Sequence, residues 1–166
     1  MRKLEFSVKS NEDPVCPICG GRLEKKDWVR RIRRKIGGEA EWLLIERRRC
    51  MNESCRKTHR LLPDCSVPYK HYEAGVIEDV IDGILDEDAL CEEEYPSEST
   101  LERWRRWAEE LLPNMEGHIR SAAYRILDMT DGFLADGMSL LDGLKERMNY
   151  GWLASAMRIY INSGGT

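Results

Sequence analysis

The pattern of apolar and polar residues changes near Tyr72. Before this residue, short apolar runs are bounded by glycine, proline and polar residues, as in β-strands. After it, apolar residues recur every three or four positions, which is the spacing of one face of a helix. We therefore predict an α+β fold that is mostly α, with a small N-terminal β module followed by helices.

Two apolar runs in the first part predict a β-hairpin. They are Trp28–Ile36 and Trp42–Arg49, and the two glycines between them are a turn signal. A helix also fits the first run, because Val29, Ile32 and Ile36 recur at three- and four-residue intervals. Strands are the preferred interpretation, because a hairpin would bring the two ends of this stretch together.

A first helix is predicted to begin near Glu73, with an apolar face of Val76, Ile77, Val80, Ile81 and Ile84. The segment Asp86–Glu94 follows, and six of its nine residues are acidic. We interpret this segment as solvated surface. A second hypothesis is that its charge screens the basic part of the chain when no ligand is bound.

A second helix is predicted to follow this acidic segment. Ser99 and Glu102 have the spacing of a capping box, in which each side chain bonds the backbone amide of the other residue. The inward face of this helix consists of Leu101, Trp104, Ala108 and Leu111. Arg103 and Arg106 on its other faces are typical of the DNA-reading helix of a helix-turn-helix. The alternative is an ordinary amphipathic helix with solvated arginines.

Three more helices are predicted towards the C-terminus, at Glu116–Met129, Phe133–Met148 and Trp152–Ile161. Pro113 and Gly132 separate them, because proline and glycine are weak helix formers. The methionines and leucines of these helices form stripes that predict helix packing rather than a cofactor pocket. The same stripes also fit the surface of a homodimer.

The net charge of −4 conceals a strong asymmetry along the chain. Residues 1–60 contain 17 Lys and Arg against 9 Asp and Glu, whereas residues 61–98 contain 1 against 12. Residues 99–166 are nearly balanced, with 8 against 9. The first third of the chain is therefore the part that would attract a polyanion such as DNA.

The sequence contains no run of eighteen apolar residues, and its first residues lack the apolar stretch of a secretion signal. We therefore expect no membrane partner and a cytoplasmic location. In that reducing compartment, closely spaced cysteines are more typical of metal ligands than of disulfides. Two of the six cysteines, Cys65 and Cys91, have no partner at ligand spacing and are interpreted as packing residues.

The other four cysteines have the spacing of zinc ligands. Cys16 and Cys19 form a C-x2-C pair, and Cys50 and Cys55 form a C-x4-C pair after thirty intervening residues. Four thiolates complete a tetrahedral shell, which predicts one structural Zn2+. The alternatives are a small core of free thiols, or His59 in place of one cysteine.

The basic residues of the two predicted strands are candidates for phosphate contacts with DNA. They are Arg30, Arg31, Arg33, Arg34, Lys35, Arg47, Arg48 and Arg49. Further candidates lie at the start of the second predicted helix, because arginine can bond guanine with two hydrogen bonds. They are Ser99, Thr100, Arg103 and Arg106.

These motifs resemble the N-terminal DNA-binding region of bacterial insertion-sequence transposases, in which a zinc ribbon precedes a helix-turn-helix. The matching motifs are CPICGG, ERRRC-x4-C, THRLLPD, PYKHY and STLERWRRW, all within residues 14–110. The resemblance implies that the four cysteines bind zinc and that Ser99–Trp107 begins the DNA-reading helix. The chain ends about where the catalytic domain of those enzymes would begin, so we expect no catalytic activity.

We divide the chain into a zinc-ribbon module at residues 1–68, a helix-turn-helix region at 69–112 and C-terminal helices at 113–166. The predicted function is zinc-dependent DNA binding, as a regulator or accessory factor of a mobile element or phage. The alternative is a protein-interaction adaptor that binds an acidic protein partner and forms oligomers through its C-terminal helices. RNA stays an alternative partner, because phosphate contacts do not distinguish the two polymers.

Overall fold

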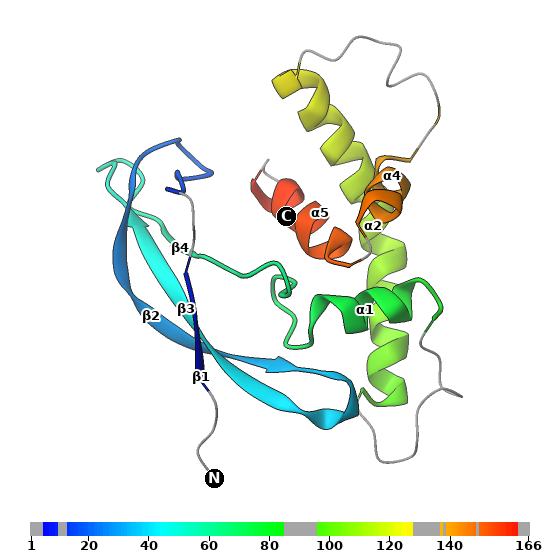
Figure 1. The fold of residues 1–166 in the computed structure, drawn as a ribbon. Coiled ribbons are helices and arrows are strands. Elements are labelled where there is room, and N and C mark those ends of the chain that lie inside the picture. Colours follow the sequence, from blue (N-terminus) through cyan, green and yellow to red (C-terminus); the bar gives the residue numbers. More distant parts are fainter. Residues whose placement is uncertain are drawn as a thin grey trace.

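A computed structural model describes residues 5–9, 13–84, 96–127, 137, 139–148 and 150–162, with the backbone alone for 122–127. Within these residues the chain has a mixed α+β fold with a four-stranded sheet and four α-helices. The sheet comes first in the chain and the helices follow, packed together beside it (Figure 1). The acidic segment Asp86–Glu94 lies outside the described residues.

Strand β3 (Ala40–Cys50) is the centre of the sheet. Strand β2 (Leu23–Arg34) pairs with one edge of β3 in antiparallel register, which confirms the predicted hairpin. The other edge is shared by two short strands, the parallel β1 (Glu5–Val8) and the antiparallel β4 (Thr58–Arg60). The long, curved hairpin therefore determines the shape of the N-terminal part (Figure 1).

The hairpin connection explains why the run from Trp28 is a strand rather than a helix. The chain reverses at the short 3-10 turn Ile36–Gly38, in which Gly37 and Gly38 both have a φ of 76°. This left-handed conformation is accessible to glycine at little cost. The strand ends at Arg34, two residues before the predicted end at Ile36.

The segment 61–73 connects the sheet to the helices and lies along β2. The backbone amide of Arg34 donates to the carbonyl of His71, and the amide of Glu73 donates to the carbonyl of Arg34. The guanidinium of Arg31 donates to the carbonyl of Val67 at 2.8 Å and also to that of Lys70. Backbone and side-chain bonds therefore attach the segment to the hairpin.

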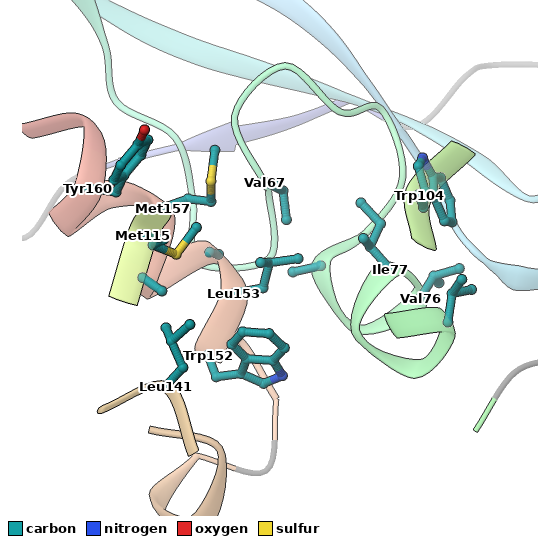
Figure 2. Packing of buried hydrophobic residues seen from close by; sticks show 14 of the residues in the cluster. Val67, Val76, Ile77, Trp104, Met115, Leu141, Trp152, Leu153, Met157 and Tyr160 are labelled. Atoms are coloured by element: carbon teal, nitrogen blue, oxygen red, sulfur yellow. The ribbon is translucent and has the colours of Figure 1, made fainter. Parts of the chain in front are cut away.

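Four helices build the main apolar core (Figure 2). They are α1 (Ala74–Ile81), α2 (Glu98–Leu127), α4 (Leu140–Arg147) and α5 (Trp152–Asn162). Of the residues predicted for the inward face of the second helix, Leu101 and Trp104 lie in this core and Leu111 packs against it. The fourth, Ala108, is also buried. Buried members from the C-terminal helices include Leu141, Leu153 and Met157, so their apolar stripes serve helix packing as predicted.

Helix α2 corrects the predicted helix break at Pro113. It is continuous over thirty residues, so it joins the two helices predicted on either side of the proline and crosses residue 113. Proline removes one backbone donor from a helix. The side-chain amide of Asn114 donates to the carbonyl of Glu110 at 3.0 Å in the same turn. Buried Met115 and Ile119 keep the helix on the core beyond the proline.

The start of α2 also differs from the predicted capping box. The helix begins at Glu98, so Ser99 lies inside it. The carbonyl of Ser97 accepts the first helical hydrogen bonds, from the amides of Thr100 and Leu101. Ser97 therefore occupies the capping position predicted for Ser99.

Two carboxylates from other helices bond the amides at the starts of α4 and α5. Glu116 of α2 accepts from the amides of Leu140 and Leu141, at 2.8 Å and 3.0 Å. Glu78 of α1 accepts from the amides of Gly151 and Leu153. These contacts satisfy amides that have no partner within their own helix. Helix α4 begins at Leu140, with Ser139 as its N-cap, and the predicted start at Phe133 lies outside the described residues.

Among the described residues, none of the helices is long and apolar enough to cross a membrane.

Candidate metal centre and nucleic-acid interface

The first two cysteines lie on a tight turn. The amide of Gly20 donates to the carbonyl of Cys16 at 2.8 Å, and the amide of Cys16 donates to that of Gly21. Gly20 has a φ of 70°, a left-handed conformation that glycine adopts at little cost. A Cβ at Gly21 would lie 3.2 Å from Cys19 Sγ and 3.1 Å from Cys50 Sγ, so only glycine fits without a shift.

The second pair begins where β3 ends. Cys50 is the last residue of that strand, and its amide donates to the carbonyl of Lys57. Between the two cysteines the chain turns around Asn52, whose carbonyl accepts from the amides of Cys55 and Arg56. The four intervening residues of the C-x4-C pair therefore form a hydrogen-bonded turn that returns Cys55 towards Cys50.

The hairpin brings the four thiols together, and we call Cys16, Cys19, Cys50 and Cys55 the metal cluster. Their sulfur atoms all lie within 4.8 Å of one another. Cys16 Sγ lies 3.7 Å from Cys55 Sγ, and Cys19 Sγ lies 3.5 Å from Cys50 Sγ. A tetrahedral site with bonds of about 2.3 Å places its sulfurs about 3.8 Å apart. The cluster therefore has the donors and spacing to bind one metal ion.

Burial and backbone amides make the thiols unequal. Burial acts to raise the pKa of Cys16, but hydrogen bonds from the backbone of Cys19 and Ile18 outweigh it and lower the pKa to about 6. At Cys50, burial raises the pKa to about 12. A metal ion would offset the cost of a buried thiolate at Cys50, because metal ligation requires the deprotonated sulfur.

His59 lies beside the metal cluster, on β4. Its Nε2 is 3.3 Å from Cys16 Sγ, which is hydrogen-bonding distance for sulfur. The four sulfurs already provide a full tetrahedral set, so His59 has the position of a hydrogen-bond partner to one ligand. Cys65 lies apart from the cluster, half-buried and 3.0 Å from a guanidinium nitrogen of Arg33, and Cys91 lies outside the described residues.

Most of the basic residues predicted to contact phosphate have partners within the chain. Their acidic partners are Glu5 for Arg30, Glu41 for Arg33 and Lys35, Asp27 for Arg47 and Glu46 for Arg48. Arg31 is half-buried against backbone carbonyls, and burial lowers its pKa. Arg34 is half-buried and also has an interaction partner. Much of the positive charge of the hairpin is thus neutralised locally.

Exposed positive charge remains at the end of the hairpin near the metal cluster. Arg49 is exposed, and among the described residues it has no acidic partner. Arg60 of β4 is also exposed and stands directly opposite Arg47 across the strand pair. Like charges opposite each other on neighbouring strands repel. Because Arg49 and Arg60 are exposed, and neither forms an ion pair within the described residues, they are better placed to contact an external anion than the central arginines.

The four candidates on α2 share one side of the helix, as their three- and four-residue spacing requires. Ser99, Arg103 and Arg106 are exposed and Thr100 is half-buried. A guanidinium nitrogen of Arg103 donates to the hydroxyl of Thr100 at 3.4 Å, and neither arginine has an acidic partner in the described part of the chain. Within the described residues, this side of α2 therefore presents two guanidinium groups without acidic partners, together with two hydroxyls.

Sequence reasoning missed Lys70, which contacts α2, and its neighbour Tyr69. Lys70 Nζ lies 4.0 Å from the centre of the Trp107 ring. Burial, and then the charge of Arg103, lower the pKa of Lys70. Tyr69 is 85% exposed and has a φ of 63°. The PYKHY motif combines basic and aromatic residues, and this combination is the sequence signal that could have identified such a site.

The comparisons with known proteins place the chain in a family without giving it a function. No curated protein and no solved structure matches the chain. A family model matches residues 16–104, which are more than half of the chain and include the metal cluster and the first turns of α2. The chain belongs to the family described as Domain of unknown function (DUF6431).

Proposed function

We propose that this chain is a zinc-dependent DNA-binding protein without catalytic activity, which contacts DNA mainly through the N-terminal turns of α2. The observation that carries the proposal is the exposed side of α2, where Arg103 and Arg106 lack acidic partners among the described residues. Unpaired guanidinium groups bond phosphates and the edges of guanine. Lys70 adds a third positive charge beside them.

The metal in this proposal is Zn2+, bound by the four thiols of the metal cluster. Thiolate ligands in a tetrahedral arrangement favour zinc over magnesium, calcium and manganese. A set of four protein ligands leaves no position for a water or substrate, which is the arrangement of a structural site. The ion would hold together the two ends of the hairpin, so that Arg49 and Arg60 contact neighbouring phosphates.

The proposed DNA-binding motif is a modified helix-turn-helix. Helices α1 and α2 pack together through residues such as Ile77 and Leu101. Residues 82–97 separate them, whereas a helix-turn-helix has a turn of about 3–4 residues. We therefore propose that α2 reads DNA as a recognition helix, supported by α1 but connected to it by a longer segment. A role as regulator or accessory factor of a mobile element rests on the resemblance of the motifs.

The test combines metal analysis with DNA binding. Native mass spectrometry should give one zinc per chain, and fluorescence anisotropy should show duplex DNA binding that weakens steeply between about 50 and about 200 mM salt. Arg103→Ala together with Arg106→Ala should weaken binding by about tenfold or more. A duplex RNA of the same sequence, measured in parallel, tests whether the partner is DNA or RNA.

The single variant Arg106→Ala should also weaken DNA binding, and Arg147→Ala is its matched control, because both remove one exposed arginine from a helix. The control should leave DNA affinity unchanged beyond the effect of one distant charge. Equal losses in both variants would contradict a contact through α2. If DNA does not bind at low salt, the DNA-binding proposal fails, while the metal measurement still decides the zinc site.

The internal ion pairs of the hairpin favour a second candidate function, a protein-interaction adaptor. Neutralised arginines such as Arg33 and Arg48 offer little attraction for a long polyanion, whereas the exposed cations that remain would suit a smaller acidic surface. Under this alternative, one zinc would bind per chain, DNA would not, and Arg103→Ala with Arg106→Ala would leave the protein partner bound. The predicted homodimer stays a prediction, which the same mass spectrum tests.

A further inference from the structure

Tyr69 occupies a backbone conformation that tyrosine rarely adopts. The amide of Lys70 donates to the carbonyl of Val67 at 3.2 Å, so residues 67–70 form a tight turn. Pro68 precedes Tyr69, which has a φ of 63°. This arrangement is that of a type II turn, in which the third position favours glycine because its φ is positive. A bulky aromatic residue there is an outlier.

The turn is held in place from both sides. Val67 is fully buried in the main core, and the guanidinium of Arg31 on β2 bonds the carbonyls of Val67 and Lys70. On the other side, the ammonium group of Lys70 lies over the ring of Trp107 on α2. The turn thus bridges the hairpin and α2, and its anchors keep Tyr69 in the unfavourable conformation.

The fixed turn presents the Tyr69 ring to solvent. Tyr69 is 85% exposed, so the ring contributes little to the core. Strained residues that the surrounding structure holds in place are concentrated at functional sites. An exposed aromatic ring on a rigid turn is suited to stack on a flat partner at a low cost in conformational entropy.

The charge around Tyr69 indicates what that partner is. Lys70 is the next residue, and Arg103 is near enough to lower the pKa of Lys70. His71 is exposed two residues after Tyr69. An exposed ring next to one cation, with a second cation close to the first, matches the combination of base stacking and phosphate contact by which proteins bind unpaired nucleotides. Inside a duplex both faces of each base are covered, so a ring can stack only on a base that has left the helix.

We propose that Tyr69 stacks on an unpaired nucleobase, while Arg103 and Lys70 contact the phosphates on either side of it. The protein would then prefer DNA in which an unpaired base adjoins a duplex over fully paired DNA. This inference rests on the proposed DNA binding through α2 and deepens it, because it names the form of DNA that the site recognises.

The test compares a DNA duplex containing one bulged 2-aminopurine with a fully paired duplex of the same length. The full-length, metal-loaded protein should bind the bulged duplex about tenfold more tightly, the effect of one base–aromatic stack. Binding should also quench the 2-aminopurine fluorescence, which reports stacking directly. Tyr69→Phe should keep the preference and the quenching, since the phenyl ring remains.

Tyr69→Gly should abolish both the preference and the quenching, while fully paired DNA binds as before. Glycine adopts positive φ readily, so this variant should be at least as stable in thermal unfolding as the native protein. Tyr150→Ala, which removes a tyrosine that is 68% exposed elsewhere, is the control and should change neither readout.

Two results would overturn the inference and are distinguishable. If the native protein binds bulged and paired DNA equally, or if Tyr69→Gly keeps the quenching, DNA binding stands and the stacking role of Tyr69 is wrong. If neither DNA is bound at low salt, the proposed function fails and the inference falls with it.

Discussion

At the scale of single residues, the arginines of the hairpin differ in whether the acid opposite them forms an ion pair with them. Arg47 is paired across the strands with Asp27, and Arg33 is paired with Glu41, so these cations meet an acid of the neighbouring strand. Arg49 lies opposite Glu24, but within the described residues Glu24 pairs with Arg22 instead, and Arg49 stays exposed. Arg47 and Arg49 lie two residues apart on the same strand, yet only the charge of Arg47 is neutralised by an ion pair among the described residues.

The carboxylate of Glu116 provides a residue-scale prediction about pH. Burial acts to raise its pKa, but the amides of Leu140 and Leu141 together with Arg120 outweigh burial and lower the pKa. A lowered pKa stabilises the fold above the ordinary glutamate pKa of about 4.3, and this stabilisation is lost as the pH falls through the folded-state pKa. Glu116→Gln should therefore reduce the free energy of unfolding at pH 7 by about 1–3 kcal/mol.

The difference between Glu116→Gln and the native protein should shrink as the pH falls from neutral to acidic, because protonation removes the same charge. Urea unfolding at a series of pH values measures it. Glu146→Gln, at an exposed acid of α4, is the control and should show a difference near zero at every pH. A loss for Glu116→Gln that is independent of pH would mean that packing, rather than charge, is responsible.

The metal cluster was predictable from the sequence, whereas the partners of the arginines were not. Two closely spaced pairs of thiols flank the hairpin, and the hairpin brings the two pairs together. The spacing alone therefore identifies the four candidate metal ligands, Cys16, Cys19, Cys50 and Cys55. The partner of an arginine depends on register, and the irregularity between Lys25 and Asp27 shifts that register by one residue. Spacing along the chain carries no sign of such a shift.

At the scale of elements, helix α2 shows tertiary packing prevailing over local propensity. Pro113 predicted a break, yet the helix continues. The apolar spacing offers the reason, because Trp104, Ala108, Met115 and Ile119 are all buried on either side of the proline. The same three- and four-residue spacing runs through the sequence on both sides of Pro113, and the continuity of this apolar face outweighs the proline.

The proline should therefore reduce stability in the present fold. Pro113 is exposed and removes a backbone hydrogen bond in the middle of the helix. Pro113→Ala should raise the free energy of unfolding by about 1–2 kcal/mol, less than the full helix penalty because proline also restricts the unfolded chain. Chemical denaturation of the metal-loaded protein measures the change.

Gly117→Ala calibrates the experiment on the same helix. An added Cβ at Gly117 would meet nothing within 4 Å, so the change should give the ordinary glycine-to-alanine gain of about 1 kcal/mol. If Gly117→Ala stabilises the protein but Pro113→Ala destabilises it, the bend imposed by the proline is needed to fit α2 to α4 and α5.

At the scale of the whole molecule, the described residues form two apolar clusters of very different size. The larger one consists of residues from α1, α2, α4, α5 and the connecting segment. The smaller one lies at the metal cluster and contains Leu23 with Cys16 and Cys50. The two parts are connected by the segment 61–73 and by side chains such as Arg31 and Arg33. The hairpin therefore has little apolar burial of its own near the metal cluster.

This imbalance predicts that metal removal unfolds the hairpin and leaves the helices folded. Where few apolar groups are buried, metal ligation supplies much of the folding free energy. After chelation, amide hydrogen exchange should accelerate strongly across Leu23–Arg34 and Ala40–Cys50, while the buried turns of α2 and α5 keep their protection. Added zinc should restore the protection of the strands.

Cys50→Ser should reproduce the effect of chelation, because it removes a buried ligand of the metal cluster. Cys65→Ser is the matched control, since Cys65 lies outside that cluster and should keep both the metal and the strand protection. If chelation instead exposes the amides of α2 and α5 together with those of the strands, the two parts unfold as one unit. In that case the bonds of Arg31 and Arg33 to the connecting segment would have to transmit the loss of the metal to the helical core.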